Sequence, residues 1–532
     1  DGSVQSFGLP GTSMDKDAYL EINASQRPAL ALFEAMGYTY ISPADCDKQR
    51  GSRYHVLLRD ILRGQLRRLN RYVYAGAENE FSAANIERAM EDLDEPLTDG
   101  LVRTSEKIYD ALLLGKSYPE TVGDGKMLSF NLRYIDWDNP QNNVFHVTEE
   151  FAVDSRDRQH NARPDIVLFI NGIPFAVIEC KAPHIPVDEA VGQMIRNQQA
   201  AYIPQLFKFA QLVVATNKNA VKYATVGTPK KFWSVWKEQD ADWLQTRLKA
   251  LVPDRMPTEQ DRNTVSLFSR ERVFELIRYF ILFDANVKKV CRYQQFFAVR
   301  EIMKTIAESD EHGNRRSGVI WHTQGSGKSL TMVMLAKYIL MELKDCHPRV
   351  VIVTDRKELD AQIAATFAHT RLTPARATSG RHLVELVNSA RADVITSIIN
   401  KFNTVERQEV KNPSRDIFVL VDESHRSNYG LMATRMRSVF PNACYIGFTG
   451  TPLMKSEKNT MARFGRLIHK YTIRDGVEDG AIVPLIYEGR FVEQKVDEEN
   501  IDLWFRQTTR RLTEAQREDL RRKGSPRSGR SA

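Results

Sequence analysis

The sequence predicts an α/β protein with two α/β domains, and three observations support this fold class. The chain of 532 residues is long enough for several domains of about 100 to 200 residues each. In the first half, short β-rich segments alternate with helical stretches, and an Asn-Gly dipeptide joins two of them. In the second half, near-continuous apolar strands alternate with helices, which is typical of a doubly wound parallel sheet.

Composition narrows the class further. Hydrophobic residues make up 42% and charged residues 27% of the chain, which excludes a disordered or fibrous protein. The net charge of +7 is consistent with a polyanionic partner but does not demonstrate one. The five cysteines form no Cys-x-x-Cys pair, and no apolar run approaches the roughly 18 residues that span a bilayer. We therefore expect a cytoplasmic protein without membrane contact.

The first domain is predicted to open with helices and to continue as a mixed α/β core. Apolar residues recur at three- and four-residue spacing, so residues 1–120 are assigned to a helical part and residues 121–255 to the core. The dipeptide Asn171-Gly172 favours a tight hairpin, because both turn positions require positive φ. Strands are expected at 128–132, 144–147, 165–170, 173–179 and 210–215, and a helix at 187–202.

The second domain is predicted to be a doubly wound sheet over residues 256–475. A connector rich in proline and charge, residues 250–263, precedes it. Residues 476–532 are expected to begin a further unit and to end in a basic tail. The apolar strands are predicted at 318–321, 349–353, 417–421 and 443–447.

A glycine-rich loop between a strand and a helix predicts a phosphate-binding site. Glycines let backbone N–H groups turn toward phosphate oxygens, and the following helix N-terminus adds its positive dipole end. We expect Lys328 to contact the β- and γ-phosphates of ATP and Ser329 to contact Mg²⁺. His322 stands where the strict pattern has its first glycine. The predicted cofactor-binding residues of the loop are Thr323, Gly325, Ser326, Gly327, Lys328 and Ser329.

Two further strand ends carry groups suited to nucleotide hydrolysis. Asp422 and Glu423 follow the strand at 417–421. A carboxylate at a strand end holds the metal, and the adjacent one polarises the attacking water, so we assign Asp422 to Mg²⁺ and Glu423 to catalysis. The segment Gly447–Pro452 follows the next strand, where its hydroxyl residues are suited to sensing nucleotide. Taken alone, each segment also fits an ordinary strand end or tight turn.

The first domain carries a second candidate site. Asp165 precedes one strand of the predicted hairpin, and Glu179 and Lys181 end the other. Residues two apart on a strand share a face, so Glu179 and Lys181 project together and Cys180 points the opposite way. Two convergent carboxylates bind a divalent ion that activates water, and a lysine orients the water or stabilises the developing charge. A surface salt bridge on a hairpin is the alternative interpretation.

Neighbouring residues extend this site. Gln198 and Tyr202 are four apart on the predicted helix at 187–202, where positions i and i+4 share a face. A third carboxylate is expected from Glu21, Glu34 or Glu149, and the sequence does not choose among them.

These motifs resemble known families. The order from Arg292 to Pro452 is similar to superfamily 2 helicases and translocases, with a DExH box and, at Arg292–Phe297, a stretch like the adenine-reading Q-motif, in which Gln295 is the candidate for the base edge. The Asp165, Glu179 and Lys181 pattern resembles PD-(D/E)xK nucleases, and the Gln198 and Tyr202 pair resembles the DNA-contacting motif of their RecB-like branch. Together, these motifs resemble the restriction (HsdR) subunit of type I restriction–modification systems over residues 20–490.

This resemblance implies a fold, partners and activity. It implies a nuclease core at 121–255, a first RecA-like lobe at 256–475 and the start of a second lobe after residue 476. It implies Mg²⁺, double-stranded DNA, and the methyltransferase (M) and specificity (S) subunits as partners. The family's Gln-x-x-Gly-Arg-x-x-Arg motif is not found after Pro452. We therefore expect a truncated form that hydrolyses little ATP alone.

Two other interpretations remain open at this point. One is a helicase–nuclease of another DNA-repair or defence system, which association with a methyltransferase–specificity complex would distinguish. The other is a non-catalytic DNA-binding module with idle sites, which a Mg²⁺-dependent nicking assay would distinguish. The DNA recognition sequence cannot be inferred from the residues.

Overall fold

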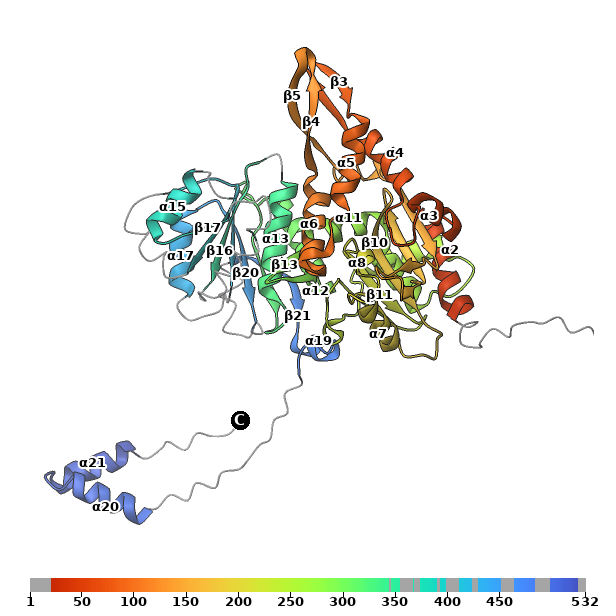
Figure 1. The fold of residues 1–532 in the computed structure, drawn as a ribbon. Helices are drawn as coiled ribbons and strands as arrows, with labels where there is room; N and C mark the ends of the chain where they lie inside the picture. The colour runs from red at the N-terminus through yellow and green to blue at the C-terminus, as the bar shows by residue number, and fades with distance from the viewer. Residues whose placement is uncertain are drawn as a thin grey trace, which may run out of the picture. The chain divides into compact units, whose positions relative to one another are not determined.

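Two larger sheets organise the first of the chain's two units (Figure 1). The computed structural model describes residues 21–343, 346–354, 367, 374–389, 393–398, 411–422, 429–450, 464–483 and 498–524. Contacts divide the chain into one unit at Asp1–Ile482 and another at Val483–Ala532. Within the second unit, the described elements are the helices α20 (Glu498–Thr508) and α21 (Glu514–Gly524).

The first large sheet is mixed and six-stranded, as a mixed α/β core requires. Its order is β1-β6-β9-β10-β11-β12, in which β1 with β6 and β10 with β11 are parallel and the other pairs are antiparallel. Strand β1 comes from the predicted helical part, so that part belongs to the same sheet. The strands are β1 (Thr39–Tyr40), β6 (Phe145–Glu149), β9 (Ile166–Ile170), β10 (Ile173–Cys180), β11 (Leu212–Thr216) and β12 (Val221–Ala224).

The predicted Asn-Gly hairpin joins β9 to β10. Asn171 has φ 53° and Gly172 φ 83°, the two positive values that the turn requires. Leu58 donates its backbone N–H to the Gly172 carbonyl at 2.9 Å, and a Cβ at Gly172 would lie 2.6 Å from the Leu58 carbonyl oxygen. The Asn171 amide is buried and forms hydrogen bonds with the side chains of Gln65 and Asn143 and with two backbone groups. Turn chemistry and close packing therefore fix this hairpin together.

The predicted helical opening is largely confirmed, but it also contains hairpins. The turn at Ala75-Gly76 has positive φ at both residues without the Asn-Gly signal, which is why the β2–β3 hairpin was not predicted. Tyr72 stacks on Phe130 with ring centroids 4.3 Å apart, so this hairpin lies beside β4–β5 (Figure 1). The elements are α2 (Arg27–Ala35), α3 (Pro43–Arg50), α4 (Arg59–Leu69), β2 (Arg71–Tyr74), β3 (Ala77–Glu80), α5 (Ala83–Leu93), α6 (Leu101–Leu114), β4 (Lys116–Val122) and β5 (Lys126–Leu132).

Helices link the two large sheets. Helix α10 begins inside the predicted connector at 250–263, with both hydrogen bonds of a capping box between Thr258 and Asp261. The connector is therefore shorter than expected. The elements are α7 (Val187–Asn197), α8 (Pro204–Phe207), α9 (Ala241–Leu251), α10 (Glu259–Phe268), α11 (Arg270–Tyr279), β13 (Ile281–Asp284), β14 (Val287–Val290) and α12 (Tyr293–Ala307).

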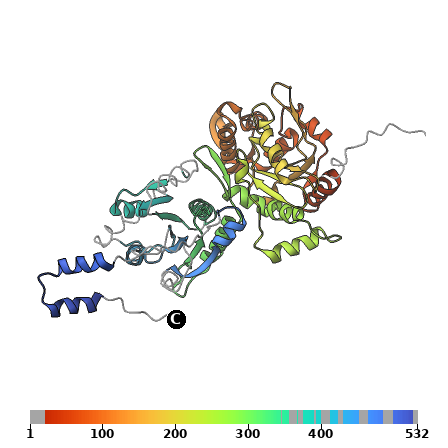
Figure 2. The ribbon, with the colours of Figure 1, turned by 90° about the horizontal axis from the view of Figure 1, so that it is seen from below.

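The second large sheet is the predicted parallel sheet. It has seven strands in the order β17-β18-β16-β19-β20-β15-β21, and every pair in it is parallel. Figure 2 shows its strands in green to blue. The strands are β15 (Gly318–His322), β16 (Arg349–Thr354), β17 (Pro374–Arg376), β18 (Val394–Ile398), β19 (Ile417–Val421), β20 (Cys444–Thr449) and β21 (Arg466–Tyr471).

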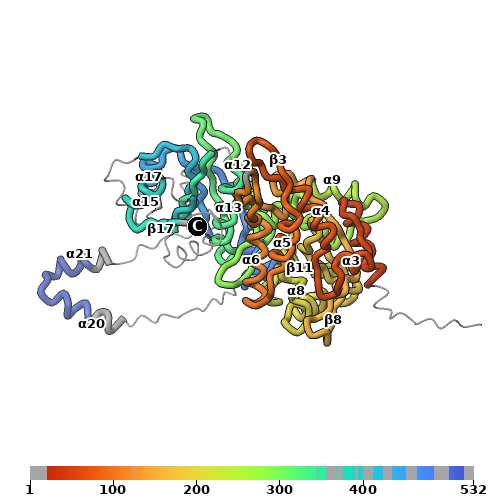
Figure 3. The backbone as a smooth tube through the Cα atoms, turned by 45° about the horizontal axis from the view of Figure 1, so that its top comes forward, coloured from red at the N-terminus to blue at the C-terminus, as the bar shows by residue number. Residues whose placement is uncertain are grey.

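Helices cover both faces of the parallel sheet. Alternate residues such as Ile352 and Leu420 belong to the core with α12 and α13 (Lys328–Glu342), which lie side by side (Figure 3). Their neighbours Val351 and Val419 belong to a second core with residues of α15 (Gly380–Ser389) and α17 (Tyr429–Val439). This two-sided burial explains why the strands are apolar throughout. In the described residues, no helix is long and apolar enough to cross a membrane.

Candidate nuclease and nucleotide sites

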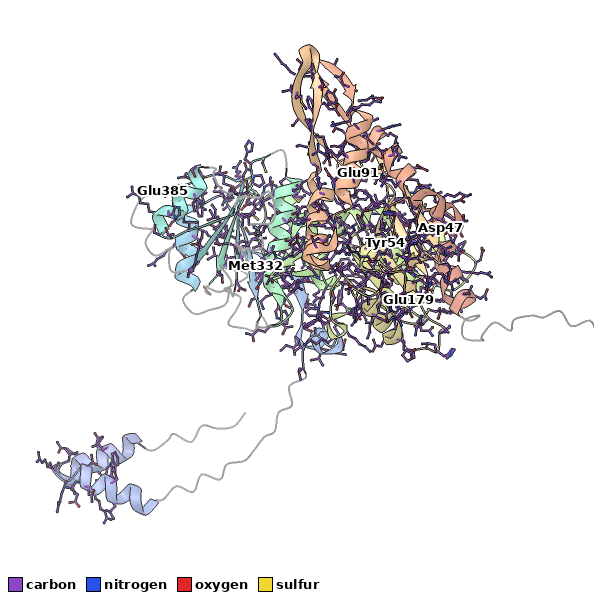
Figure 4. All side chains as sticks on the ribbon, viewed as in Figure 1. Asp47, Tyr54, Glu91, Glu179, Met332 and Glu385 are labelled. Atoms are coloured by element: carbon purple, nitrogen blue, oxygen red, sulfur yellow. The ribbon has the colours of Figure 1, made fainter. Side chains whose placement is uncertain are left out.

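The β9–β10 hairpin brings Asp165 and Glu179 opposite each other. The register pairs Val167 with Val177 and Ile166 with Ile178, and its continuation pairs Asp165 with Glu179. Asp165 is further fixed because its Oδ2 accepts a hydrogen bond from the Cys180 backbone N–H at 2.6 Å. Both carboxylates are buried, and Figure 4 labels Glu179 among the side chains of this region.

Lys181 completes the predicted trio. Its Nζ donates to Glu179 Oε1 at 3.2 Å, and its backbone N–H donates to the Thr216 carbonyl at 2.8 Å on the neighbouring strand. The contact with Glu179 fits the expectation that the two side chains share a face. Cys180 is fully buried, as expected for the residue that points the opposite way.

Burial dominates the electrostatics of this site. Desolvation, followed by the charge of Glu179, raises the pKa of Asp165 well above its usual value. Desolvation also raises the pKa of Glu179 to about 7, even though Lys181 opposes the shift. Burial alone would lower the pKa of Lys181, but Glu179, Asp165 and Glu21 together raise it. Carboxyl pKa values raised by burial beside a charged lysine mark this cluster as a candidate functional site.

The residues present fit a divalent ion. Glu179 Oε2 is buried and, in the described part of the chain, has no hydrogen-bond partner. Carboxylate oxygens are the ligands that Mg²⁺ prefers, and one or two of them normally suffice because the ion keeps several waters. No cluster of three or more His, Cys, Asp or Glu side chains suited to a metal occurs among the described residues. The candidate centre is therefore a two-carboxylate site.

Of the three candidates for a further carboxylate, Glu21 is the one that reaches the site. Its Oε2 lies 3.7 Å from Lys181 Nζ, and burial raises its pKa. Glu149 instead accepts a hydrogen bond from the Tyr40 hydroxyl at 2.9 Å, and Glu34 is exposed on α2.

The expectation that Gln198 and Tyr202 share one helix is wrong. Helix α7 ends at Asn197, because Gln198 and Gln199 form tighter bonds to residues three back and the chain then turns. The Gln198 amide donates to the Met194 carbonyl at 3.1 Å and accepts from the Gly227 N–H at 2.8 Å. Both side chains nevertheless line one cavity of about 630 Å³. Their role in DNA contact stays a prediction.

Sequence reasoning missed Arg196. This residue lies on α7, and its positive charge lowers the pKa of Glu179 against the effect of burial. Its guanidinium also lies 5.4 Å from the centre of the Tyr202 ring. Arg196 therefore connects the two-carboxylate site with the wall of the 630 Å³ cavity. No motif marks it, since its position depends on how α7 packs on β10 and β11.

The glycine-rich loop has the backbone of a phosphate-binding loop. Gly325 and Gly327 have φ 79° and 88°, and α13 begins at Lys328 directly after the loop. Lys328 Nζ donates to the carbonyls of His322 at 3.3 Å and Thr323 at 3.5 Å. The Thr323 N–H donates to the Tyr471 carbonyl of β21 at 2.9 Å. Ser326 is buried, and Ser329 is partly exposed on the first turn of the helix.

Neighbouring strands bring two more predicted groups to this edge of the sheet. Asp422 follows β19 directly, is buried, and donates its backbone N–H to the Val353 carbonyl. Gly450 follows β20, and a Cβ placed on it would lie 3.1 Å from Lys328 Nζ. Its lack of a side chain therefore leaves room for the lysine. Glu423, Thr451 and Pro452 lie outside the described residues.

Gln295 lies against the loop. Its Oε1 accepts from the Arg292 N–H at 2.8 Å, and its Nε2 donates to the Gly327 carbonyl at 3.0 Å. The residue thus caps α12 and contacts the phosphate loop. Its predicted contact with the adenine edge stays a prediction.

The fold and these sites define a class: an α/β protein that joins a two-carboxylate nuclease-type sheet to a P-loop motor lobe. Comparison with known proteins specifies the family. Residues 18–232 match the type I restriction enzyme R protein N terminus (HSDR_N), and residues 294–518 match the SWI2/SNF2 ATPase family. Both matches agree with the resemblance to type I restriction enzyme R (HsdR) subunits that the sequence motifs predicted.

Individual relatives agree with this assignment. The MjaIXP type I restriction endonuclease subunit of Methanocaldococcus jannaschii is 29% identical over 94% of this chain and 49% of the relative. The HindI endonuclease subunit of Haemophilus influenzae is 30% identical over 74% of this chain and 40% of the relative. The chain thus spans less than half the length of these curated relatives. An HsdR fragment structure from Vibrio vulnificus matches with a TM-score of 0.28 and 17% identity over 63% of this chain and 56% of the fragment.

Proposed function

We propose that this chain supplies the nuclease domain and first motor lobe of a type I restriction endonuclease, in which ATP-driven translocation of double-stranded DNA is coupled to Mg²⁺-dependent cleavage of unmodified DNA. The observation that carries the proposal is the pair of buried carboxylates, Asp165 and Glu179, beside the charged Lys181. The domain limits at residues 120, 255 and 475 are part of the proposal.

In the nuclease site, Asp165 and Glu179 would hold Mg²⁺. A bound divalent ion lowers the pKa of water and stabilises negative charge on a phosphodiester. Lys181 lies beside the metal-binding oxygens, and its raised pKa keeps the ammonium charged to stabilise the pentacovalent transition state. Asp165 and Glu179 are buried and Lys181 is partly buried, which strengthens these interactions by limiting bulk water. Gln198 and Tyr202 are assigned to DNA contact.

In the motor site, Lys328 binds the β- and γ-phosphates of ATP. Ser329 and Asp422 hold Mg²⁺, and the adjacent Glu423 polarises the attacking water. The glycines of the loop present backbone N–H groups to the phosphates, and Gln295 reads the adenine edge. The two sites lie on separate sheets, so each is expected to function with the other disabled.

The proposed partners are double-stranded DNA and the M and S subunits of a restriction–modification complex in the cytoplasm. Relatives are named type I restriction endonuclease subunits, which supports this choice. Co-purification with M and S subunits tests it against a helicase–nuclease of another system.

A nicking assay tests the nuclease half directly. Supercoiled DNA is incubated with Mg²⁺ and the wild-type chain, Asp165→Ala or Lys181→Ala, with the exposed Lys230→Ala as matched control. We expect Lys230→Ala to nick like wild type and the other two to be inactive. Equal residual nicking in all four proteins would remove the nuclease assignment.

A further inference from the structure

Three side chains form a hydrogen-bonded chain behind the phosphate loop. His322 Nε2 lies 2.8 Å from His469 Nδ1, and His469 Nε2 lies 2.7 Å from Gln239 Oε1. His322 is the last residue of β15, directly before the loop, and His469 lies on the neighbouring strand β21. None of the motifs accounts for His469 or Gln239.

Gln239 directly follows a segment that the fold anchors at three residues. Ser234 pairs with Tyr223 of β12, and the Trp236 ring packs on Phe296 of α12 with centroids 5.2 Å apart. Glu238 forms a buried ion pair with Arg272 at 3.1 Å. The end of the hydrogen-bonded chain is therefore held by the surrounding fold.

The hydrogen-bond partners assign one tautomer to each ring, taking Gln239 Oε1 as the acceptor at the end of the chain. Because Gln239 Oε1 accepts a hydrogen bond, His469 Nε2 carries the proton. In a neutral imidazole the other nitrogen is then an acceptor, so His469 Nδ1 accepts from a protonated His322 Nε2. His322 Nδ1 is left without a proton, and it is buried with no partner in the described part of the chain. The chain of donors thus runs from His322 to Gln239.

The surroundings favour neutral rings. Burial, aided by His469 and Lys328, lowers the pKa of His322 well below its usual value. Burial also lowers the pKa of His469 to about 4, although Glu301 and Asp475 oppose the shift. Both rings are therefore neutral at physiological pH.

We propose that His469, supported by Gln239, is a positioning residue of the nucleotide site that holds the His322 ring and thereby the start of the phosphate loop. The backbone carbonyl of His322 accepts from Lys328 Nζ, so the residue that carries the ring also positions the phosphate-binding lysine. The neighbouring bond from Thr323 to Tyr471 makes β21 a two-point support for the loop. The inference rests on the proposed ATP site.

Binding of a fluorescent ATP analogue with Mg²⁺ to the full chain tests this role. His469→Leu leaves the His322 donor unsatisfied in a buried place, and we expect it to weaken binding about 10-fold. His469→Asn offers an amide oxygen near the position of Nδ1, and we expect it to recover most of this loss. His312→Leu, at an exposed histidine, is the control and should bind like wild type.

A second pair of variants covers the case in which His469→Leu does not fold. Gln239 is exposed, so its substitution should be tolerated. Glu at position 239 keeps an acceptor for His469, whereas Leu removes it, and we expect Gln239→Glu to bind several-fold more tightly than Gln239→Leu. Ring ¹⁵N shifts should report protonated Nε2 on both histidines.

Failure of the proposed ATP site and failure of the His469 positioning role would give different binding results. If the wild-type chain does not bind the analogue, the ATP site itself is wrong. If the wild type binds but a folded His469→Leu binds equally well, or Asn recovers nothing, the positioning role is overturned. Equal affinities of the two Gln239 variants, or a protonated His322 Nδ1, would also overturn it.

Discussion

The nuclease site and the nucleotide site are assembled in different ways. Asp165, Glu179 and Lys181 come from one hairpin, whose turn and register alone place the two carboxylates opposite each other. The nucleotide site collects Lys328, Asp422 and Gly450 from the ends of three parallel strands that are far apart in the sequence. A local site depends on one turn, whereas a non-local site depends on the packing of the whole sheet.

The largest expected effect is on cleavage. Asp165→Ala or Lys181→Ala should reduce Mg²⁺-dependent nicking about 1000-fold, because Asp165 would hold the metal and Lys181 would stabilise charge on the reacting phosphate. ATP-analogue affinity should not change, since that site lies on the other sheet. Nicking rates and analogue affinity measured on the same preparations check both statements. A parallel loss of both activities would show that the sites are not independent.

The hairpin turn offers the next test. Gly172→Ala should destabilise the chain by about 3 kcal/mol, combining positive-φ strain with a clash against the Leu58 carbonyl. Gly125→Ala is the control: its φ is 72°, but nothing lies within 4 Å of the added Cβ, so about 1 kcal/mol is expected. Urea unfolding measures both. Similar losses would mean that packing on the turn is unimportant.

A change in the phosphate loop should affect nucleotide binding and spare cleavage, the reverse of the changes at Asp165 and Lys181. Lys328→Ala should weaken ATP-analogue binding about 100-fold by removing charge-assisted hydrogen bonds to the phosphates. Metal-dependent nicking should persist. The same two assays check this expectation, and retained analogue binding would contradict the assignment of the loop.

The smallest effect concerns a buried lysine between the two sheets. Lys337 of α13 donates to the Tyr109 hydroxyl of α6 at 2.7 Å, and burial lowers its pKa from 10.5 to about 7. At roughly 1.4 kcal/mol per pH unit this burial costs up to about 4 to 5 kcal/mol, and two hydrogen bonds return about 2. Lys337→Met should therefore raise the free energy of unfolding by about 2 kcal/mol at pH 7.

The free energy of unfolding should depend on pH in a direction that the lowered pKa of Lys337 determines. Between about pH 7 and 10.5 the unfolded lysine binds a proton that the folded one does not, so the wild type gains stability as the pH rises through this window. The advantage of Lys337→Met should shrink accordingly. Lys304→Met, at an exposed lysine of α12, is the control and should show little change. An unchanged difference between Lys337→Met and wild type from pH 7 to 10 would contradict the lowered pKa.

Much of the fold could be predicted because the signals were local. The strand at Ile417–Val421 and the turn at Asn171-Gly172 follow from apolar runs and turn chemistry. The β2–β3 hairpin was missed because its Ala75-Gly76 turn carries no such signal. The helix assigned through Tyr202 ends at Asn197, where the Gln198 amide bonds to the backbone of Gly227 from a distant segment.

The sequence by itself determined the fold class, indicated the family resemblance and predicted the chemical groups of both sites, because residue type and strand periodicity are properties of the chain itself. Tertiary structure decided which distant groups join them. It placed Glu21 beside Lys181, brought the charge of Arg196 near Glu179, and set His469 against His322. These contacts arise from the packing of separate elements, and a single sequence carries no local signal for that packing.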